Sequence, residues 1–417
     1  MSAVPSTSPA PSPRSVAPEA TRALLVGAAG LAVVLVGVLV SGAHVAATAW
    51  LLGVVYWTAM IIGALMLVMI HHIFDASWSV VLRRQWEHAL AAFKWLALLF
   101  LPLLVLSWMA PHDLIWPWMN PGHVIANGET VGTDLLYAKK SSFLNLHAMT
   151  FFSVVFFGIW LWLSARLRQA SFTQDADGNA KWTLKNRVTA GFGLPLGALT
   201  LTFAAVYWVK SLEYHWFSTM FGVWYFANCM RGAYALTVIV MVWLYNRGDF
   251  KGIIHTYTFW SIGQMMLAFT VFWGYVSFSQ YFLIWNANVP EETFWYNLRE
   301  HGDWWYVGMF IVFGTFLLPF LLLLSYRFKV THLAIRRIAR WILFVIFVDI
   351  SFNLMPALKD AHGDPQPFLS INLLWSAAAV IGVGGVCAWA YLRSFESARA
   401  RLIPIRDPRI GECLANQ

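Results

Sequence analysis

Long apolar stretches alternate with short polar segments along the whole chain. A helix needs about 20 mostly apolar residues to cross the hydrocarbon core of a bilayer. Ten segments meet this requirement, and no long polar domain separates them. The predicted spans are 23–41, 46–72, 87–109, 142–165, 188–209, 215–245, 256–285, 304–326, 338–356 and 370–392. The pattern therefore predicts an all-α polytopic membrane protein.

The segments outside the spans complete the predicted organisation. Residues 1–22 are rich in Pro, Ser and Ala and lack a short apolar region with a cleavage site, which predicts a disordered tail. Residues 23–392 form one ten-span domain, and residues 393–417 form a C-terminal tail. The largest interruptions between spans are 110–141 and 166–187.

Composition supports a membrane protein and excludes several kinds of redox centre. The 417 residues are 59% hydrophobic and 12% charged, with a mean hydropathy of +0.61. The three cysteines, Cys229, Cys387 and Cys413, form no CxxC or CxxCH motif. Covalent haem attachment, iron–sulfur ligation and a disulfide framework are therefore not expected in this chain, and no metal site is predicted.

The distribution of charge predicts the orientation in the membrane. A pI near 9.4 could indicate nucleic-acid binding, but most of the 28 lysines and arginines lie in the tails and in alternate loops. Such an alternation follows the positive-inside rule, so both termini are predicted to be cytoplasmic and no nucleic-acid partner is expected. Acidic residues gather in the opposite loops, where an outer partner could dock.

The first polar cluster is the hairpin MIHHIFDASWSVVLRRQWEHALAAFKW. On a helix, His71 and His72 both have a spacing that brings them to the same face as Asp75, and Glu87 and His88 follow across a short turn. A histidine beside a carboxylate can pass protons, which makes these five residues proton-path candidates. The alternative is an interfacial hairpin whose charges pair with lipid headgroups and with one another.

The second cluster lies at the predicted outer ends of the fifth and sixth spans. Lys210, Glu213, His215 and Trp216 combine proton acceptors with an aromatic ring, which is what a quinol head group requires. We therefore treat them as quinone-pocket candidates. The alternative is an aromatic belt with a local ion pair.

Arg231 lies deep within a predicted span. Sixteen residues separate it from Arg247, which corresponds to about 24 Å along a helix. A charge at this depth must face protein or water and needs a partner. Asp349 has a similar predicted depth, so we predict an Arg231–Asp349 pair, with Gln264 as a further member of the same proton-path network.

Three segments carry a resemblance to a known family: DASWSVVLRRQWE, KSLEYHWFSTMFGVWYF and FSQYFLIWNANVPEETFWY. They resemble the second quinone-binding-type membrane subunit of bacterial alternative complex III, a quinol:cytochrome c oxidoreductase. This subunit is similar to the polysulfide-reductase-type (NrfD-like) membrane proteins. The resemblance covers nearly the whole chain in the order of motifs, and its most specific part is the segment 288–292 in its aromatic frame.

The resemblance implies two four-helix bundles, 46–209 and 215–356, with the first and last spans peripheral. It also implies an inner-membrane complex that contains a sister NrfD-like quinol-binding subunit, an iron–sulfur subunit, and multihaem and monohaem cytochrome c subunits. Haem and iron–sulfur centres would lie in those partners, and a terminal oxidase and lipids could also associate. Menaquinone or ubiquinone is the implied small-molecule ligand, and proton conduction has been suggested for such bundles.

Three functions are compatible with the sequence. The leading interpretation is a subunit that scaffolds a quinol-oxidising complex, lines a quinone pocket or conducts protons, and is not catalytic alone. A secondary transporter with Arg231 and Asp349 at a midplane site is the second. A purely structural membrane anchor is the third.

Overall fold

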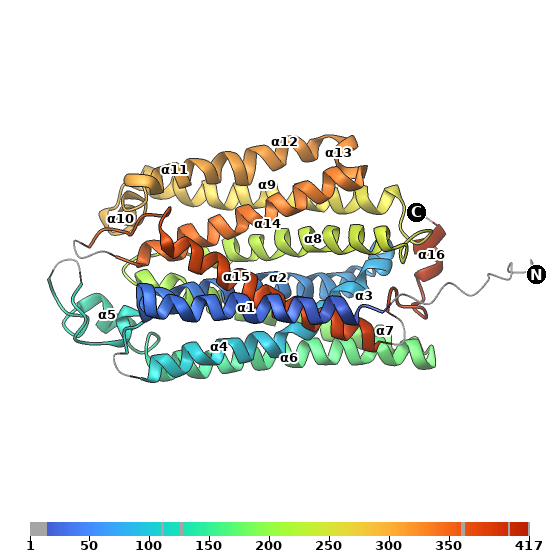
Figure 1. Ribbon diagram of the computed structural model, residues 1–417, viewed down its shortest axis with the longest axis horizontal. Helices are drawn as coiled ribbons and strands as arrows, with labels where there is room; N and C mark the ends of the chain where they lie inside the picture. Colours follow the sequence, from blue (N-terminus) through green and yellow to red (C-terminus); the bar gives the residue numbers. More distant parts are fainter. Residues whose placement is uncertain (1–14, 110–111, 126–127, 360–362, 399–400, 416–417) are drawn as a thin grey trace, which may run out of the picture.

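The computed structural model describes residues 15–109, 112–125, 128–359, 363–398 and 401–415. In this part of the chain, helices are the regular structure and no β-strand is formed. Ten of the described helical segments are long and apolar enough to cross a membrane. They run side by side along the long axis of the molecule (Figure 1). The predicted all-α polytopic fold is therefore confirmed.

The spans and the short helices have the following bounds. The spans comprise α1 (Ala17–Ser41), α2 (Ala43–Phe74), α3 (Val80–Ala89) with α4 (Phe93–Trp108), α6 (Leu146–Asp177), α7 (Lys181–Trp208), α8 (Phe221–Arg247), α9 (Thr256–Ala287), α11 (Gly302–Phe310) with α12 (Leu318–Leu324), α14 (His332–Leu354) and α15 (Ile371–Ser397). The short helices are α5 (Leu135–Lys140), α10 (Pro290–Asn297), α13 (Tyr326–Val330) and α16 (Ile410–Ala415). Tight 3-10 turns include η1 (Ser77–Ser79), η2 (Leu90–Ala92), η3 (Pro117–Met119), η4 (Lys210–Glu213) and η6 (Met355–Ala357), and η5 (Ile311–Leu317) is π-helical.

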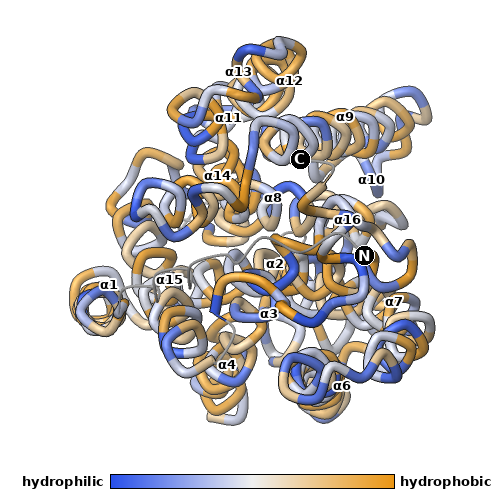
Figure 2. The backbone as a smooth tube through the Cα atoms, turned by 90° about the vertical axis from the view of Figure 1, so that its right-hand side faces the viewer, coloured by the Kyte–Doolittle hydropathy of each residue, from blue (hydrophilic) through white to orange (hydrophobic). Residues whose placement is uncertain are grey.

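Eight spans form two groups of four helices. The first unit consists of α2, α3 with α4, α6 and α7, and the second consists of α8, α9, α11 with α12, and α14. Helix α2 packs against α8 and joins the two units. Helices α1 and α15 pack on each other at the edge, where α15 also contacts α2 (Figure 2). This arrangement agrees with the two bundles and two peripheral spans implied by the resemblance.

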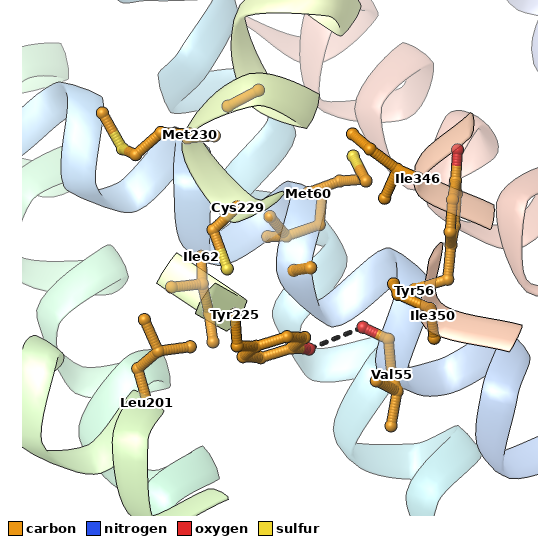
Figure 3. Close-up of a cluster of buried hydrophobic side chains, with 14 of the residues drawn as sticks. Val55, Tyr56, Met60, Ile62, Leu201, Tyr225, Cys229, Met230, Ile346 and Ile350 are labelled. Carbon is orange, nitrogen blue, oxygen red and sulfur yellow. Dashed lines mark hydrogen bonds between the residues drawn. The ribbon is translucent and has the colours of Figure 1, made fainter. Parts of the chain in front are cut away.

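The contact between α2 and α8 depends on close backbone approach. A Cβ atom on Gly63 would lie 2.1 Å from the carbonyl oxygen of Cys229, so only glycine fits at this crossing. The surrounding core is apolar, and Tyr225 satisfies its buried hydroxyl by donating to the carbonyl oxygen of Val55 at 2.7 Å (Figure 3). The two units therefore meet across a dense apolar layer.

The edge pair α1 and α15 also packs through glycines that allow close backbone approach. A Cβ atom on Gly30 would lie 2.7 Å from the backbone of Gly382, and one on Gly385 would lie 2.4 Å from the backbone of Gly27. Small residues let membrane helices approach closely, where van der Waals packing replaces the hydrophobic effect. The first and last spans are therefore held to each other over much of their length.

Several boundaries differ from the sequence-based prediction. Helix α6 ends at Asp177 rather than at residue 165 and α7 begins at Lys181 rather than at residue 188, so the predicted interruption 166–187 is mostly helical. Two further differences have a clear physical reason. Helix α1 begins at Ala17, within the segment predicted to be disordered, because helix-favouring residues precede its apolar run; residues 1–14 lie outside the described part. The third span begins at Ser77 rather than at residue 87. Arg83 and Arg84, which lie in the predicted loop, are helical here because carboxylates of the protein pair with them. An average of hydropathy along the sequence contains no information about such partners.

Candidate functional sites

A network of buried charges lies at the end of the bundle where α16 is found, here called the basic end (Figure 1). Arg83 Nε lies 3.1 Å from Glu87 Oε1, and Arg84 Nη1 donates to Glu87 Oε2 at 2.7 Å. All three side chains are at most 1% exposed. Buried charges of this kind are stable only when they are paired.

Two more carboxylates in this network come from distant parts of the chain. Arg83 Nη1 donates to Asp407 Oδ2 at 2.5 Å, and Arg84 Nη2 donates to Asp175 in α6. With Glu87, these residues form the basic-end network. It ties α3 to α6 and to the C-terminal segment, so these charges pair with protein and not with lipid headgroups.

The predicted pairing of Asp75 with His71 and His72 is wrong. Asp75 ends α2 in the left-handed conformation, with φ 52°, so its side chain leaves the helix face that the spacing assumed. Its carboxylate pairs with Arg187 at 2.8 Å and with Arg409 at 2.6 Å. Asp75 therefore joins the end of α2 to α7 and to the C-terminal segment.

The two histidines have other partners. His71 Nδ1 lies 2.8 Å from the Ser79 hydroxyl, and its Nε2 lies 3.1 Å from Arg83 Nη1. Because the guanidinium can only donate, His71 accepts at Nε2. His72 Nε2 lies 3.3 Å from Asn186 Nδ2. Among the described residues neither histidine shares a hydrogen bond with a carboxylate, so the geometry does not form the expected proton relay.

His88 holds the C-terminal segment to the bundle. Its Nε2 lies 2.9 Å from the carbonyl oxygen of Arg401, which can only accept, so Nε2 carries the proton. Its Nδ1 therefore accepts from the Ser394 hydroxyl at 3.0 Å, and that hydroxyl oxygen accepts from Arg168 Nη2 at 2.8 Å. His88 and Glu87 therefore both hold neighbouring segments together at the basic end.

Arg231 is fully buried, but the predicted direct pair with Asp349 is not formed. Within the described residues no ion pair at 4.0 Å or less joins the two side chains. Arg231 Nη2 instead donates to the carbonyl oxygen of Thr315 at 2.9 Å, and its guanidinium lies 5.0 Å from the ring centre of Trp273. Trp273 Nε1 in turn donates to Asp349 Oδ2 at 2.9 Å. The tryptophan therefore contacts both charged groups.

Asp349 is held by neutral donors from two helices. Besides Trp273, its Oδ2 accepts from Trp224 Nε1 at 3.0 Å and from Asn228 Nδ2 at 2.8 Å. Three donors on one oxygen fix the orientation of the carboxylate. The prediction that Gln264 joins this network is wrong, because its Oε1 accepts from Lys329 Nζ instead.

The acceptor for Arg231 results from a break in the α-helical pattern. Thr315 lies in η5, and Pro319 has no backbone N–H with which to bond the Thr315 carbonyl four residues earlier. That carbonyl is therefore available to Arg231. The Nε and Nη1 atoms of Arg231 are buried without a hydrogen-bond partner. The sequence signal was Pro319, which helix patterning alone did not connect to the arginine.

The opposite end of the bundle contains a second buried ion pair. Arg299 Nη2 donates to Glu213 Oε2 at 2.7 Å, and the guanidinium lies 3.6 Å from the ring centre of Trp295. The ring of Trp295 stacks on that of Trp216 with centroids 4.4 Å apart. We call these four residues the rim cluster. Arg299 and Trp295 were not among the sequence-based candidates.

Of the remaining candidates at this end, His215 bonds to the loop before α6, and Lys210 bonds to the backbone between α7 and α8. His215 Nε2 and the Tyr214 hydroxyl each lie 2.8 Å from Asp134 Oδ2. Burial acts to raise the pKa of Asp134, but hydrogen bonds from Tyr214 and from backbone, with nearby His215, hold it below its ordinary value. Lys210 Nζ donates to the carbonyl oxygen of Trp216 at 2.9 Å.

A quinone head group needs a free proton acceptor and an open aromatic face. Glu213 and His215 are bound to Arg299 and Asp134, and one face of Trp216 is covered by Trp295. The arrangement as folded does not fit a quinone, so no quinone step is assigned to it. The quinone-pocket assignment stays a prediction.

Lys210 gives the protein a pH-dependent stability. Burial, together with nearby Lys140, lowers the pKa of Lys210 from 10.5 to about 8. Between these values the unfolded chain binds the proton that the folded chain has released, so stability rises with pH over this window. The melting temperature of the wild type minus that of Lys210→Met should therefore increase from pH 8 to pH 10.5.

Lys139→Met removes an exposed lysine near the same place and serves as the charge control. A wild-type minus Lys210→Met difference that follows the control across this pH range would contradict the assignment.

Comparisons of the sequence with protein-family models and with curated proteins found no match.

Proposed function

We propose that this integral membrane protein is a subunit of a quinol-oxidising electron-transfer complex of the alternative complex III type. Its main role is to scaffold the membrane part and to present a rigid outer surface to the partners. This proposal rests on the resemblance of three segments and on the way two of them meet in space. The ten-span membrane architecture is the shared premise.

The observation that carries the proposal is the contact between two family-like segments far apart in the sequence. Trp216 of the first stacks on Trp295 of the second. The Ser218 hydroxyl donates to Gln280 Oε1 at 2.7 Å, and Gln280 Nε2 donates to the Tyr296 hydroxyl at 3.2 Å. The residues that carry the resemblance therefore stabilise one surface, which is expected of a docking platform more than of a pocket.

Helix α10 strengthens this surface. The sequence placed Pro290 before two glutamates, and the helix starts at that proline with Glu291 and Glu292 in its first turn. Acidic residues are favoured there by the helix dipole; Glu291 is exposed and Glu292 is half-buried. We infer that this end faces outward in a bacterial inner membrane, that both termini are cytoplasmic, and that the iron–sulfur and cytochrome c subunits dock here. The sister NrfD-like subunit would hold the quinol site.

One observation favours the secondary transporter as the second candidate. The break at η5 places the Thr315 carbonyl, which accepts from the buried Arg231, at mid-depth near Asp349. Transporters build midplane sites from interrupted helices. In the leading proposal the same residues are a structural joint or a step in a proton path.

Purification of the tagged chain from its own membranes in a mild detergent tests the proposal. Co-elution with c-type haem absorbance and with an iron–sulfur subunit is expected, at a constant ratio across the peak. A lone chain, free of haem and stabilised by a small solute, would overturn the proposal in favour of the transporter. A parallel sample with Trp295→Ala should lose the partners while retaining its ten-span fold, because the docking surface depends on that ring.

A further inference from the structure

A pocket lined by cations opens at the basic end, between α4, α6 and α15. It has a volume of about 590 Å³. Three cationic side chains from these three helices line it: Lys94, Arg168 and Arg393. Ser394, which accepts from Arg168, also lies in its wall. None of the three cations belongs to the basic-end network.

The positive charge of this pocket is only partly balanced by nearby carboxylates, Glu87 near Arg168 and Glu396 in the wall. Within the described residues Lys94, Arg168 and Arg393 form no ion pair, and Arg168 Nε is buried without a hydrogen-bond partner. The acidic residue of the wall, Glu396, already accepts from the backbone N–H of Val16 at 2.9 Å and lies 3.5 Å from Arg401 Nη2. The pocket therefore suits an anion.

The surroundings favour a lipid over a free anion. Two tryptophans, Trp95 and Trp389, line the pocket with ring centroids 4.7 Å apart, as is common at the level of headgroups. Below Lys94, α4 exposes Leu98, Leu101 and Val105, which follow it at spacings of four, seven and eleven residues. These spacings lie on one face of a helix, so an acyl chain could follow the helix from the cationic end.

We propose that this pocket binds the phosphate of an anionic phospholipid, with an acyl chain along the exposed face of α4. Basic pockets between spans are where such headgroups bind. The lipid joins α15 to α4 and α6, and so fastens the edge pair to the first four-helix unit. This proposal does not depend on the proposed function.

The test compares lipid-induced stabilisation of the purified full-length protein and of two charge-matched double variants. Lys94→Gln with Arg393→Gln removes two pocket cations, both exposed enough to leave the fold intact. Arg166→Gln with Lys185→Gln removes two exposed cations at the same end but outside the pocket lining. Melting temperature is titrated with phosphatidylglycerol, cardiolipin, phosphatidylcholine and glycerol phosphate.

The wild type and the control variant should be stabilised by the two anionic lipids, and the pocket variant should need at least about tenfold more lipid for the same shift. Equal responses of the pocket and control variants would overturn the site. Equal stabilisation by phosphatidylcholine would overturn its selectivity for anions. A full response to glycerol phosphate would overturn the lipid as the occupant and leave an anion site without a chain.

Discussion

Glu87→Gln is expected to destabilise the protein by about 3–5 kcal/mol, because it removes the shared partner of two buried arginines. The Glu87 carboxylate pairs with Arg83 and Arg84 and also accepts from the Ser171 hydroxyl at 2.9 Å. Glutamine keeps the shape of the side chain but loses its negative charge. The positive charges of Arg83 and Arg84 are then balanced by fewer carboxylates. The measurement is the melting temperature in detergent, followed by tryptophan fluorescence.

Glu412→Gln is the matched control, because Glu412 is 51% exposed and lies 4.0 Å from Arg409. An exposed pair of this kind contributes at most about 1 kcal/mol. If Glu87→Gln melts as late as the control, the network does not stabilise the basic end. The experiment also separates two roles of Glu87. A proton-path residue would lose proton conduction in a protein that remains stable, whereas a structural residue loses stability first.

Gly63→Ala is expected to cost about 3 kcal/mol or more, which is the upper end for overpacking a core. The new Cβ would lie 2.1 Å from the carbonyl oxygen of Cys229 and 2.7 Å from the Cβ of Ala233. A backbone atom cannot rotate away as a side chain can, so α2 and α8 must separate. Because this contact joins the two four-helix units, we expect much less folded protein in membranes as well as earlier melting.

Gly191→Ala in α7 provides the control, because no atom lies within 4 Å of the position of its Cβ. It should change stability by no more than about 1 kcal/mol, the usual range for glycine and alanine in a helix. Similar melting of the two variants would show that the α2–α8 contact yields easily. Crowding at Gly63 would then not limit the fold.

Much of the fold could be predicted from hydropathy, because each span must be apolar wherever it meets lipid. The predicted 46–72 corresponds to α2 and 370–392 to α15, with longer helices at the ends. The third span was predicted to start too late, at residue 87. Its first turns carry charges whose partners, such as Asp407, are remote in sequence.

The candidate sites were harder to predict, because their residues were identified correctly as unusual but given the wrong neighbours. Spacing on a helix suggested a pair of His71 with Asp75. Asp75, however, ends α2 in the left-handed conformation, and this turns its side chain away from His71. Similar depth suggested Arg231 with Asp349, yet each of them contacts Trp273 and they form no ion pair with each other. Depth gives the position of a residue along the membrane normal, and spacing gives its position relative to others on the same helix. A contact between two helices also depends on how each helix is rotated about its axis.

The link between Arg83 and Asp407 has a consequence for biosynthesis. The two residues are separated by 324 positions in the chain. Arg83 therefore enters the membrane region long before the ribosome has made Asp407, and a segment translated after all ten spans completes the basic end. Folding of this end is therefore completed only after that segment is made. A chain that stops before Asp407 would have all ten spans and still lack the ion pair between Arg83 and Asp407.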